Sequence, residues 1–391
     1  MKNKAKKIIA IIISMILLVM LATPACAEST EEIDAEVARI FKKWKTSGGI
    51  LVVAKDGKII YEKAYGFADK IAKEKVSSDS YFRIASVSKL VTGCVAMKLM
   101  ESGNLDIDRN IGEYLADPAY KVANPMFPKV SITTRMLMSH TSSIKADGGF
   151  SRGKAISEML NVKKRKQSNF YQKKPGTYYK YSNYGVGTLG CMIEFITGQK
   201  LSTAAKQLLF NELEIDAAYS PVYLKNPEMI TTIYNKDGSI GLTRARKLRE
   251  EYNADIDVDH DYYEGYGRIY IKGKDLCRIG IMLCDGGIID EKRILKEETV
   301  QEMLSSQKGK GGITIDSPYG LCVHREKTLL KGKIIYGHQG LLDGVLCNLY
   351  FDPETRFVFV MLTNGCKSDM NDHVGSLSRY MFDFAWKTFN E

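Results

Sequence analysis

A serine followed three residues later by a lysine can supply the nucleophile and the base of an acyl-transfer reaction when both lie on one helical turn. The ammonium then lies near the hydroxyl, and the helix N-terminus favours the alkoxide and lowers the pKa of the amine. A lysine-rich chain also produces this spacing by chance, so the pattern alone does not identify a nucleophile. The sequence contains it four times, at Ser86–Lys89, Ser142–Lys145, Ser151–Lys154 and Ser305–Lys308.

The context of Ser86 separates it from the other three serines. Apolar residues recur at helical spacing through residues 89–100, which predicts a buried helix that begins at Ser86. The apolar and aromatic lead-in Tyr81–Ala85 precedes it, whereas the other pairs lie in polar, glycine-containing or helix-ending stretches. Ser86 is therefore the candidate nucleophile and Lys89 its candidate base. The structural alternative is that Ser86 only caps the helix.

Two further motifs have residue types that suit the same chemistry. Tyr181-Ser182-Asn183 is the only Tyr-x-Asn among the 22 tyrosines, and it offers a phenol to relay a proton and an amide to orient a substrate. His338-Gln339-Gly340 opens a predicted strand edge, whose backbone could bind an extended acyl chain and help to form an oxyanion hole. Taken singly, Tyr181 would be a structural tyrosine and His338 a strand-end histidine. Together, and in this order, the three motifs reinforce one another.

Composition and the first residues narrow the class of protein. The 391 residues are 45% hydrophobic and carry a net charge of +10, which is ordinary for a globular chain. Lysines before an apolar run at residues 8–22, followed by Ala25-Cys26-Ala27, predict a secretory signal over residues 1–27 and an extracytoplasmic location. Membrane contact is expected only through this signal if it is uncleaved. The basic run Lys163–Lys166 has no nucleic-acid reading motif beside it, so we expect no nucleic-acid partner.

The cysteines and histidines predict neither a disulfide framework nor a metal site. Seven widely spaced cysteines follow Cys26, mostly within apolar segments, which is typical of small buried side chains. The five histidines form no helix-spaced pair, and the acidic cluster around Asp255 and Asp261 lacks the glycine and glutamate of a calcium loop. We therefore expect no metal and no cofactor.

The order of the predicted elements indicates an α+β fold. A hairpin is expected at residues 49–64 around Asp56-Gly57, and strands are expected again at 333–336, 345–351 and 357–362, before a final helix at 370–389. Helical patterns dominate the middle of the chain. The economical arrangement is one antiparallel sheet from both termini, flanked by helices, with a mostly helical lobe beside it. The expected boundaries are a signal at 1–27, a hydrolase domain at 28–391, an α/β lobe at about 28–105 and 314–391, and a helical lobe at about 106–313.

These motifs resemble those of the serine β-lactamase and D-alanyl-D-alanine carboxypeptidase family, on the branch related to class C β-lactamases. The resemblance covers nearly all of the chain after the signal. The matching blocks are Phe82–Lys89, Glu101–Asp108, Met136–Ser143, Tyr181–Gly185, Tyr270–Leu276, Gly337–Gly344 and Asn364-Gly365.

The resemblance implies a role for each motif. Ser86 would be acylated, Lys89 would be its general base, and Tyr181 would shuttle the proton to the leaving group. Asn183 would hold the amide of the substrate. His338 would contact the substrate carboxylate or the proton network of Tyr181, and the strand at Gly340 would supply part of an oxyanion hole, with a backbone N–H near Leu341 or Leu342. His140, in the Met136–Ser143 block, is interpreted as structural.

The chain departs from the family pattern at two positions that bear on substrates. The third motif is His-x-Gly, whereas efficient β-lactamases of this branch have Lys-Thr-Gly, and a histidine is only partly charged near neutral pH. Arg268 stands where the family has a small residue. It could bind a substrate carboxylate at the rim of the cleft, or it could be a solvated loop arginine.

The favoured function is therefore an exported serine hydrolase that acts as a D-alanyl-D-alanine carboxypeptidase on cell-wall peptides through an acyl-enzyme. An esterase of D-alanyl or other acyl esters is the runner-up. A β-lactamase, with β-lactams as substrates, and a non-catalytic module that binds wall fragments are less favoured.

Overall fold

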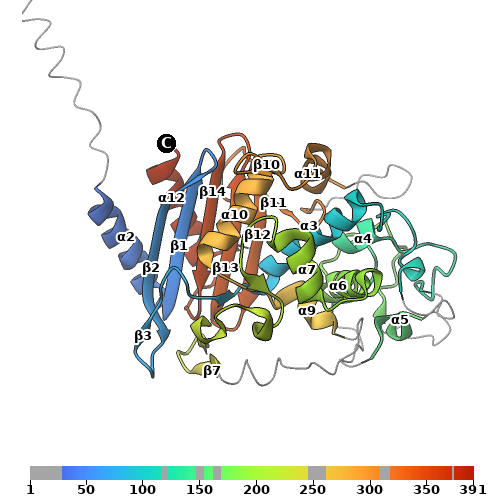
Figure 1. Ribbon diagram of the computed structural model, residues 1–391, viewed down its shortest axis with the longest axis horizontal. Helices are drawn as coiled ribbons and strands as arrows, with labels where there is room; N and C mark the ends of the chain where they lie inside the picture. Colours follow the sequence, from blue (N-terminus) through green and yellow to red (C-terminus); the bar gives the residue numbers. More distant parts are fainter. Residues whose placement is uncertain are drawn as a thin grey trace, which may run out of the picture. The chain divides into compact units, whose positions relative to one another are not determined.

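Strands from both ends of the chain form one antiparallel sheet. The computed structural model describes residues 29–115, 122–146, 154–161, 169–244, 261–307, 318–371 and 374–391. Its main sheet has seven strands in the order β11-β12-β13-β14-β1-β2-β3, so the last long strand pairs with the first. The predicted α+β fold with a sheet from both termini is confirmed (Figure 1). The strands are β1 (Gly48–Lys55), β2 (Lys58–Asp69), β3 (Glu74–Lys75), β11 (His324–Glu326), β12 (Ile335–Leu342), β13 (Val345–Asp352) and β14 (Phe357–Thr363).

The β1–β2 hairpin turns where the sequence predicts it. Asp56 and Gly57 both have positive φ, at 51° and 78°, which is the backbone of the tight turns that match strand twist. An aspartate and a glycine tolerate this conformation better than other residues do. The register that follows pairs Val52 with Val360 of β14, at the centre of the sheet.

Alternation along β14 places two helices on opposite faces of the sheet. A Cβ at Gly280 of α10 would touch Val358 and Leu349, so α10 lies on the face of the even-numbered β14 residues. Phe382 of α12 contacts Phe357 and Phe359 on the other face. The sheet is therefore covered on both faces, which explains why β13 and β14 are buried along their whole length.

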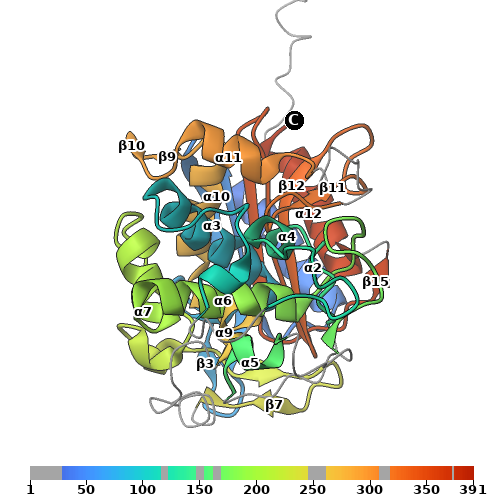
Figure 2. The same cartoon turned by 90° about the vertical axis from the view of Figure 1, so that its right-hand side faces the viewer.

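The helices that carry the motifs lie beside the sheet. α3 is buried on nearly all sides, and it contacts α6, α9 and β12 (Figure 2). An apolar helix of this kind must be enclosed, which explains the continuous apolar pattern after Ser86. The helices are α2 (Thr30–Lys43), α3 (Ser88–Glu101), α4 (Thr134–Met138), α5 (Ile156–Met159), α6 (Asn183–Thr197), α7 (Leu201–Ala205), α9 (Tyr262–Gly267), α10 (Gly273–Cys284), α11 (Glu297–Leu304) and α12 (Ser376–Phe389).

Short elements connect these helices. Single helical turns occur at η1 (Ala85–Val87), η2 (Ile111–Glu113), η5 (Lys206–Phe210), η6 (Pro221–Tyr223) and η7 (Pro227–Met229). The small strands are β4 (Phe82–Arg83), β5 (Ala217–Ala218), β6 (Ile233–Tyr234), β7 (Ile240–Leu242), β8 (Tyr270–Ile271), β9 (Ile288–Ile289), β10 (Lys292–Arg293), β15 (Met370–Asn371) and β16 (Val374–Gly375).

One expectation about an element boundary is corrected. The final helix begins at Ser376 rather than at residue 370, because residues 370–371 and 374–375 pair as β15 and β16. α10 belongs to the segment assigned to the helical lobe, yet it packs on the sheet. Residues 40–391 form one compact unit, and the division into two lobes stays a prediction.

Several sequence features lie outside the described residues: the expected signal at 1–27, the basic run Lys163–Lys166, and the acidic residues before Asp261. In the described part, the seven cysteines are buried and free, as predicted. None of the helices described is both long and apolar enough to cross a bilayer.

Candidate active site

Ser86 lies in a strained turn between β4 and α3. The residue before it, Ala85, has φ of 46°, a left-handed conformation that is unfavourable for a residue with a Cβ. Pairing of β4 with β8 holds the chain before this turn, and the buried helix α3 holds the chain after it. The surrounding structure thus fixes a backbone that the turn would not adopt alone, as is common at functional sites.

Lys89 lies directly beside the Ser86 hydroxyl. Its Nζ is 2.9 Å from Ser86 Oγ and 2.9 Å from the carbonyl oxygen of Tyr266, which accepts a hydrogen bond from it. The side chain is completely buried. Burial lowers the pKa of Lys89 to about 7, because the charged ammonium loses its hydration. Near neutral pH, much of the amine is therefore uncharged and can accept the serine proton.

Tyr181 approaches Ser86 from the loop before α6. Its phenol hydrogen-bonds Ser86, and burial raises the pKa of Tyr181, so the phenol keeps its proton at neutral pH. Lys89 Nζ lies 5.0 Å from the centre of the Tyr181 ring. Ser182 fixes this loop by capping α6, since its hydroxyl accepts the N–H of Gly185 at 3.0 Å. The structure thus brings Ser86, Lys89 and Tyr181 together, as the motifs predict.

Asn183 is the first residue of α6 and presents an open acceptor. Its Oδ1 is buried and has no hydrogen-bond partner among the described residues. A buried amide oxygen without a partner is costly, at about 1–3 kcal/mol. A substrate N–H would satisfy it.

Gly340 lets β12 lie against the nucleophile turn. A Cβ at this position would stand 2.1 Å from the carbonyl oxygen of Ile84 and 3.1 Å from the backbone nitrogen of Ser86. Only glycine permits this approach. The contact with the Ser86 turn therefore explains why the His338-Gln339-Gly340 motif ends in a glycine.

We predict that Gly340→Ala lowers kcat/KM by about 100-fold, because the added methyl displaces β12 or the Ser86 turn by a fraction of an ångström or more. The matched control is Gly267→Ala, whose Cβ would lie no closer than 4.0 Å to Ala85. Steady-state kinetics and thermal unfolding of both variants check this. A Gly340→Ala protein with wild-type kcat/KM would show that the contact does not matter.

His338 does not present a free cation to the cleft. It is buried, its Nδ1 lies 2.6 Å from the carbonyl oxygen of Gln339, and its Nε2 lies 3.1 Å from the Tyr319 hydroxyl. Burial and the nearby Lys89 charge hold the pKa of His338 well below its usual range. The expected contact with a substrate carboxylate is thus disfavoured. Its ring centre is 6.4 Å from that of Tyr181, beside the expected proton network.

The structure also corrects both interpretations of Arg268. Its side chain is buried, and its guanidinium binds Asp261 at 2.9 Å, in an ion pair with both side chains less than one-tenth exposed. It is therefore neither a solvated loop arginine nor a free carboxylate ligand at the rim. The pKa of nearby Glu264 rises to about 8, first through burial and then through the charges of Glu194 and Asp261.

The sequence analysis missed two residues of this site. His140 is buried, as expected for a structural residue, but it lies in the site: its ring centre is 4.4 Å from that of Tyr181, and its Nδ1 accepts the N–H of Ser182 at 3.2 Å. Its Nε2 is buried without a partner among the described residues. Tyr319 hydrogen-bonds His338 and contacts the rings of His140 and Tyr181. His140 belongs to the Met136–Ser143 block, which could have indicated it. No motif in the sequence marks Tyr319.

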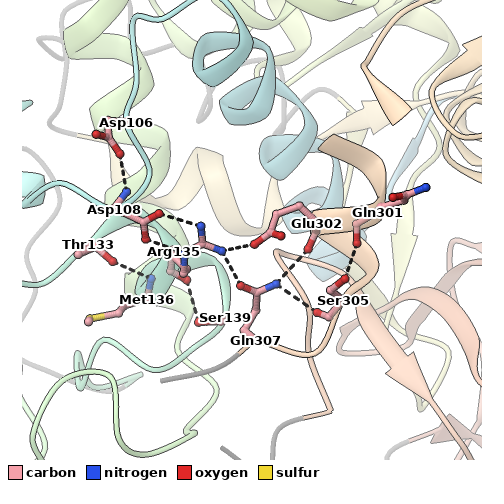
Figure 3. A network of polar contacts seen from close by, with 10 residues as sticks. All are labelled: Asp106, Asp108, Thr133, Arg135, Met136, Ser139, Gln301, Glu302, Ser305 and Gln307. Atoms are coloured by element: carbon pink, nitrogen blue, oxygen red, sulfur yellow. Dashed lines mark hydrogen bonds and ion pairs between the residues drawn. The ribbon is translucent and has the colours of Figure 1, made fainter. Parts of the chain in front are cut away.

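An ion-pair cluster braces the helix that leads to His140. Arg135 of α4 binds both carboxylate oxygens of Asp108, at 2.6 and 2.8 Å, together with Glu302 at the end of α11 and the amide oxygen of Gln307 (Figure 3). A groove of about 530 Å³ adjoins this cluster. Because the bidentate pair joins separate segments, it fixes α4 and therefore the position of His140.

The described residues contain no group of three or more histidine, cysteine or acidic side chains placed to hold a metal ion. The chemistry assembled here is that of a serine nucleophile, a buried amine and a phenol.

Comparison with known proteins identifies the family of the chain. The family model described as Beta-lactamase matches residues 33–377. The chain belongs to this family. The family includes serine hydrolases, and the resemblance inferred from the motifs is confirmed.

Individual relatives are distant. The chain is 28% identical over 176 residues to "Protein flp" of Staphylococcus aureus (strain N315), which covers 44% of this chain and 34% of that protein. It therefore spans about a third of the length of this first relative. It is 26% identical over 200 residues to "Esterase EstB" of Burkholderia gladioli, covering 48% of this chain and 50% of that protein.

A solved structure shares the fold across most of the chain. The octameric penicillin-binding protein homologue from Pyrococcus abyssi superposes with a TM-score of 0.69 at 18% identity, covering 92% of this chain and 78% of that one. This identity is low, so the likeness establishes the family fold and no substrate.

Proposed function

We propose that the protein is a serine hydrolase that forms an acyl-enzyme on Ser86 and acts on acyl esters whose leaving group carries no charge. The observation that carries the first part is the 2.9 Å contact between Ser86 Oγ and Lys89 Nζ, with a lysine pKa of about 7. An uncharged amine can take the serine proton as the hydroxyl attacks the acyl carbon. The same proton then reaches the leaving group through Tyr181.

The state of His338 and Arg268 supports the ester as substrate. A D-alanyl-D-alanine peptide and a β-lactam both carry a carboxylate that needs a positive partner. His338 has a lowered pKa and both ring nitrogens engaged, and Arg268 is paired with Asp261. An ester with an uncharged leaving group needs neither side chain. We therefore rank the esterase above the carboxypeptidase that the motifs alone favour, and the β-lactamase below both.

The acyl part of the substrate is proposed to contain an amide. The unpartnered Oδ1 of Asn183 would accept an N–H from an acylated amino acid or peptide. N-acyl-D-alanyl esters combine this N–H with an ester bond. A non-catalytic binding module is disfavoured, because it would not need a buried lysine beside a serine.

Export of the protein is also part of the proposal, and it is supported by the signal pattern of residues 1–27. Cell-wall material is then the accessible source of peptides and acyl groups.

Two thiol esters that differ only at the leaving group test the substrate proposal. We would compare N-acetyl-D-alanyl thioglycolate, whose leaving group carries a carboxylate, with the same thiol ester after that carboxylate is converted to a methyl ester. For each compound, kcat/KM for cleavage of the thiol ester is divided by the rate of its uncatalysed hydrolysis. The proposal predicts that the uncharged methyl ester is preferred by about tenfold or more, because a carboxylate would be buried without a partner. If the enzyme prefers N-acetyl-D-alanyl thioglycolate, with its free carboxylate, the result would favour a carboxypeptidase function instead.

A further inference from the structure

The hydrogen bonds of His338 fix the position of its ring proton. A carbonyl oxygen can only accept, so the 2.6 Å contact with Gln339 places a proton on Nδ1. In the uncharged ring, Nε2 is then the acceptor, and the Tyr319 hydroxyl donates to it at 3.1 Å. The nitrogen that could face a substrate carboxylate is thus already occupied by a phenol.

The Gln339 carbonyl, which accepts the Nδ1 proton, raises the pKa of His338, but burial and the charged groups around the imidazole lower that pKa further. Lys89 of α3 carries a positive charge when protonated, and this charge lowers the pKa of His338. The two nearby histidines, His140 and His324, lower it in the same way. Tyr181 and Tyr319 present uncharged phenols, because burial raises the pKa of each. None of these five groups would stabilise an imidazolium as a carboxylate does.

Tyr319 is held so that its hydroxyl cannot easily leave Nε2. The side chain is only 5% exposed, and its ring contacts His140 edge-on at 4.8 Å and His324 at 5.0 Å. The chain after it is tied down as well, because the N–H of Leu321 donates to Met303 and that of Cys322 donates to Met138. The phenol is therefore buried in a segment that backbone hydrogen bonds join to α4 and α11.

We propose that Tyr319 is a specificity-determining residue, whose hydroxyl occupies Nε2 of His338 and so directs the site away from acyl donors with a carboxylate on the leaving group. Tyr319 acts through His338 and is a positioning residue. This inference rests on the proposed ester function, since it explains the expected preference for uncharged leaving groups.

The test uses the two thiol esters defined above. We would measure the ratio of kcat/KM for the methylated compound to kcat/KM for N-acetyl-D-alanyl thioglycolate, in wild type and in Tyr319→Phe. Without the hydroxyl, Nε2 can take a proton and bind the carboxylate, and the incoming charge favours that protonation. We expect the ratio to fall by about tenfold at about pH 6 and by less at about pH 8, where the imidazole is harder to protonate. The matched control is Tyr350→Phe, which removes the hydroxyl of a buried tyrosine packed against Phe359 and Phe382. It should keep the wild-type ratio.

The outcomes separate the two claims. An unchanged ratio in Tyr319→Phe, with the methyl ester still preferred by wild type, overturns the inference and leaves the proposed function intact. The proposed function is refuted if the wild-type enzyme prefers N-acetyl-D-alanyl thioglycolate to the methylated compound, or if it hydrolyses neither thiol ester. The inference is then refuted as well.

Because the ratio compares two substrates on one protein, a partial loss of folded enzyme does not change it. If Tyr319→Phe does not fold, side-chain ¹H–¹⁵N NMR of wild type decides, with the His338 signal assigned by its loss in His338→Gln. A proton on Nδ1 alone at about pH 6 supports the inference, and a proton on Nε2 overturns it.

Discussion

Replacing Ser86 by alanine should lower kcat for the preferred thiol ester by about 10⁴-fold or more, because no acyl-enzyme can then form. The serine contributes the nucleophilic oxygen itself, so no neighbouring group can replace it. Activity that remains would come from water attacking a substrate held by the other groups of the site. Turnover at high enzyme concentration, with purified folded protein, measures the effect.

The control for Ser86→Ala is Ser305→Ala, which removes a serine from one of the other three Ser-x-x-Lys patterns. The Ser305 hydroxyl, at the end of α11, donates to the carbonyl oxygen of Gln301, and the other hydrogen bonds of Ser305 use its backbone, which the variant keeps. Its variant should keep activity within about twofold. Comparable losses in both variants would mean that the spacing at Ser86 has no special role.

Replacing Lys89 by methionine should lower kcat by about 10³-fold, since general-base catalysis contributes roughly 10²–10⁴-fold. Methionine puts an apolar side chain of similar length at this buried position, so the fold should keep its unfolding temperature. Single-turnover acylation rates separate this loss from any change in substrate binding.

The same lysine predicts the pH dependence of the wild type. Only the uncharged amine can accept a proton, so the rate should rise with pH through the Lys89 pKa of about 7 and then level off. In Lys89→Met the residual rate should lack this step. The control is Lys98→Met, which removes a lysine of the same helix that binds Glu212. A wild-type profile without a rise near neutral pH would contradict the assignment of Lys89 as the base.

The sequence predicted the parts of this molecule that depend on local patterns. The Asp56-Gly57 turn, the apolar helix after Ser86 and the alternating strands near the C-terminus are each encoded by neighbouring residues. The family blocks then gave the order of the three motifs. Spacing along one helical turn is also local, which explains why Lys89 lies beside Ser86 in the structure.

Contacts between distant segments could not be predicted in this way. Tyr319 meets His338 and His140 only because β11, β12 and the end of α4 converge, and no motif marks it. Arg268 was misinterpreted for another reason: its partner, Asp261, lies only seven residues earlier at the other end of α9, but burial of the pair depends on the packing of that helix in the fold. The state of His338 likewise depends on burial and on Lys89, which the His-x-Gly pattern does not reveal.

The most direct test of the central claim is the intact mass of the protein after it is mixed with the thiol ester and quenched in acid. The account predicts a mass increase of one N-acetyl-D-alanyl group, which peptide mapping assigns to Ser86 and which is absent in Ser86→Ala. An acyl group on any other residue, or turnover in Ser86→Ala close to the wild-type rate, would contradict it.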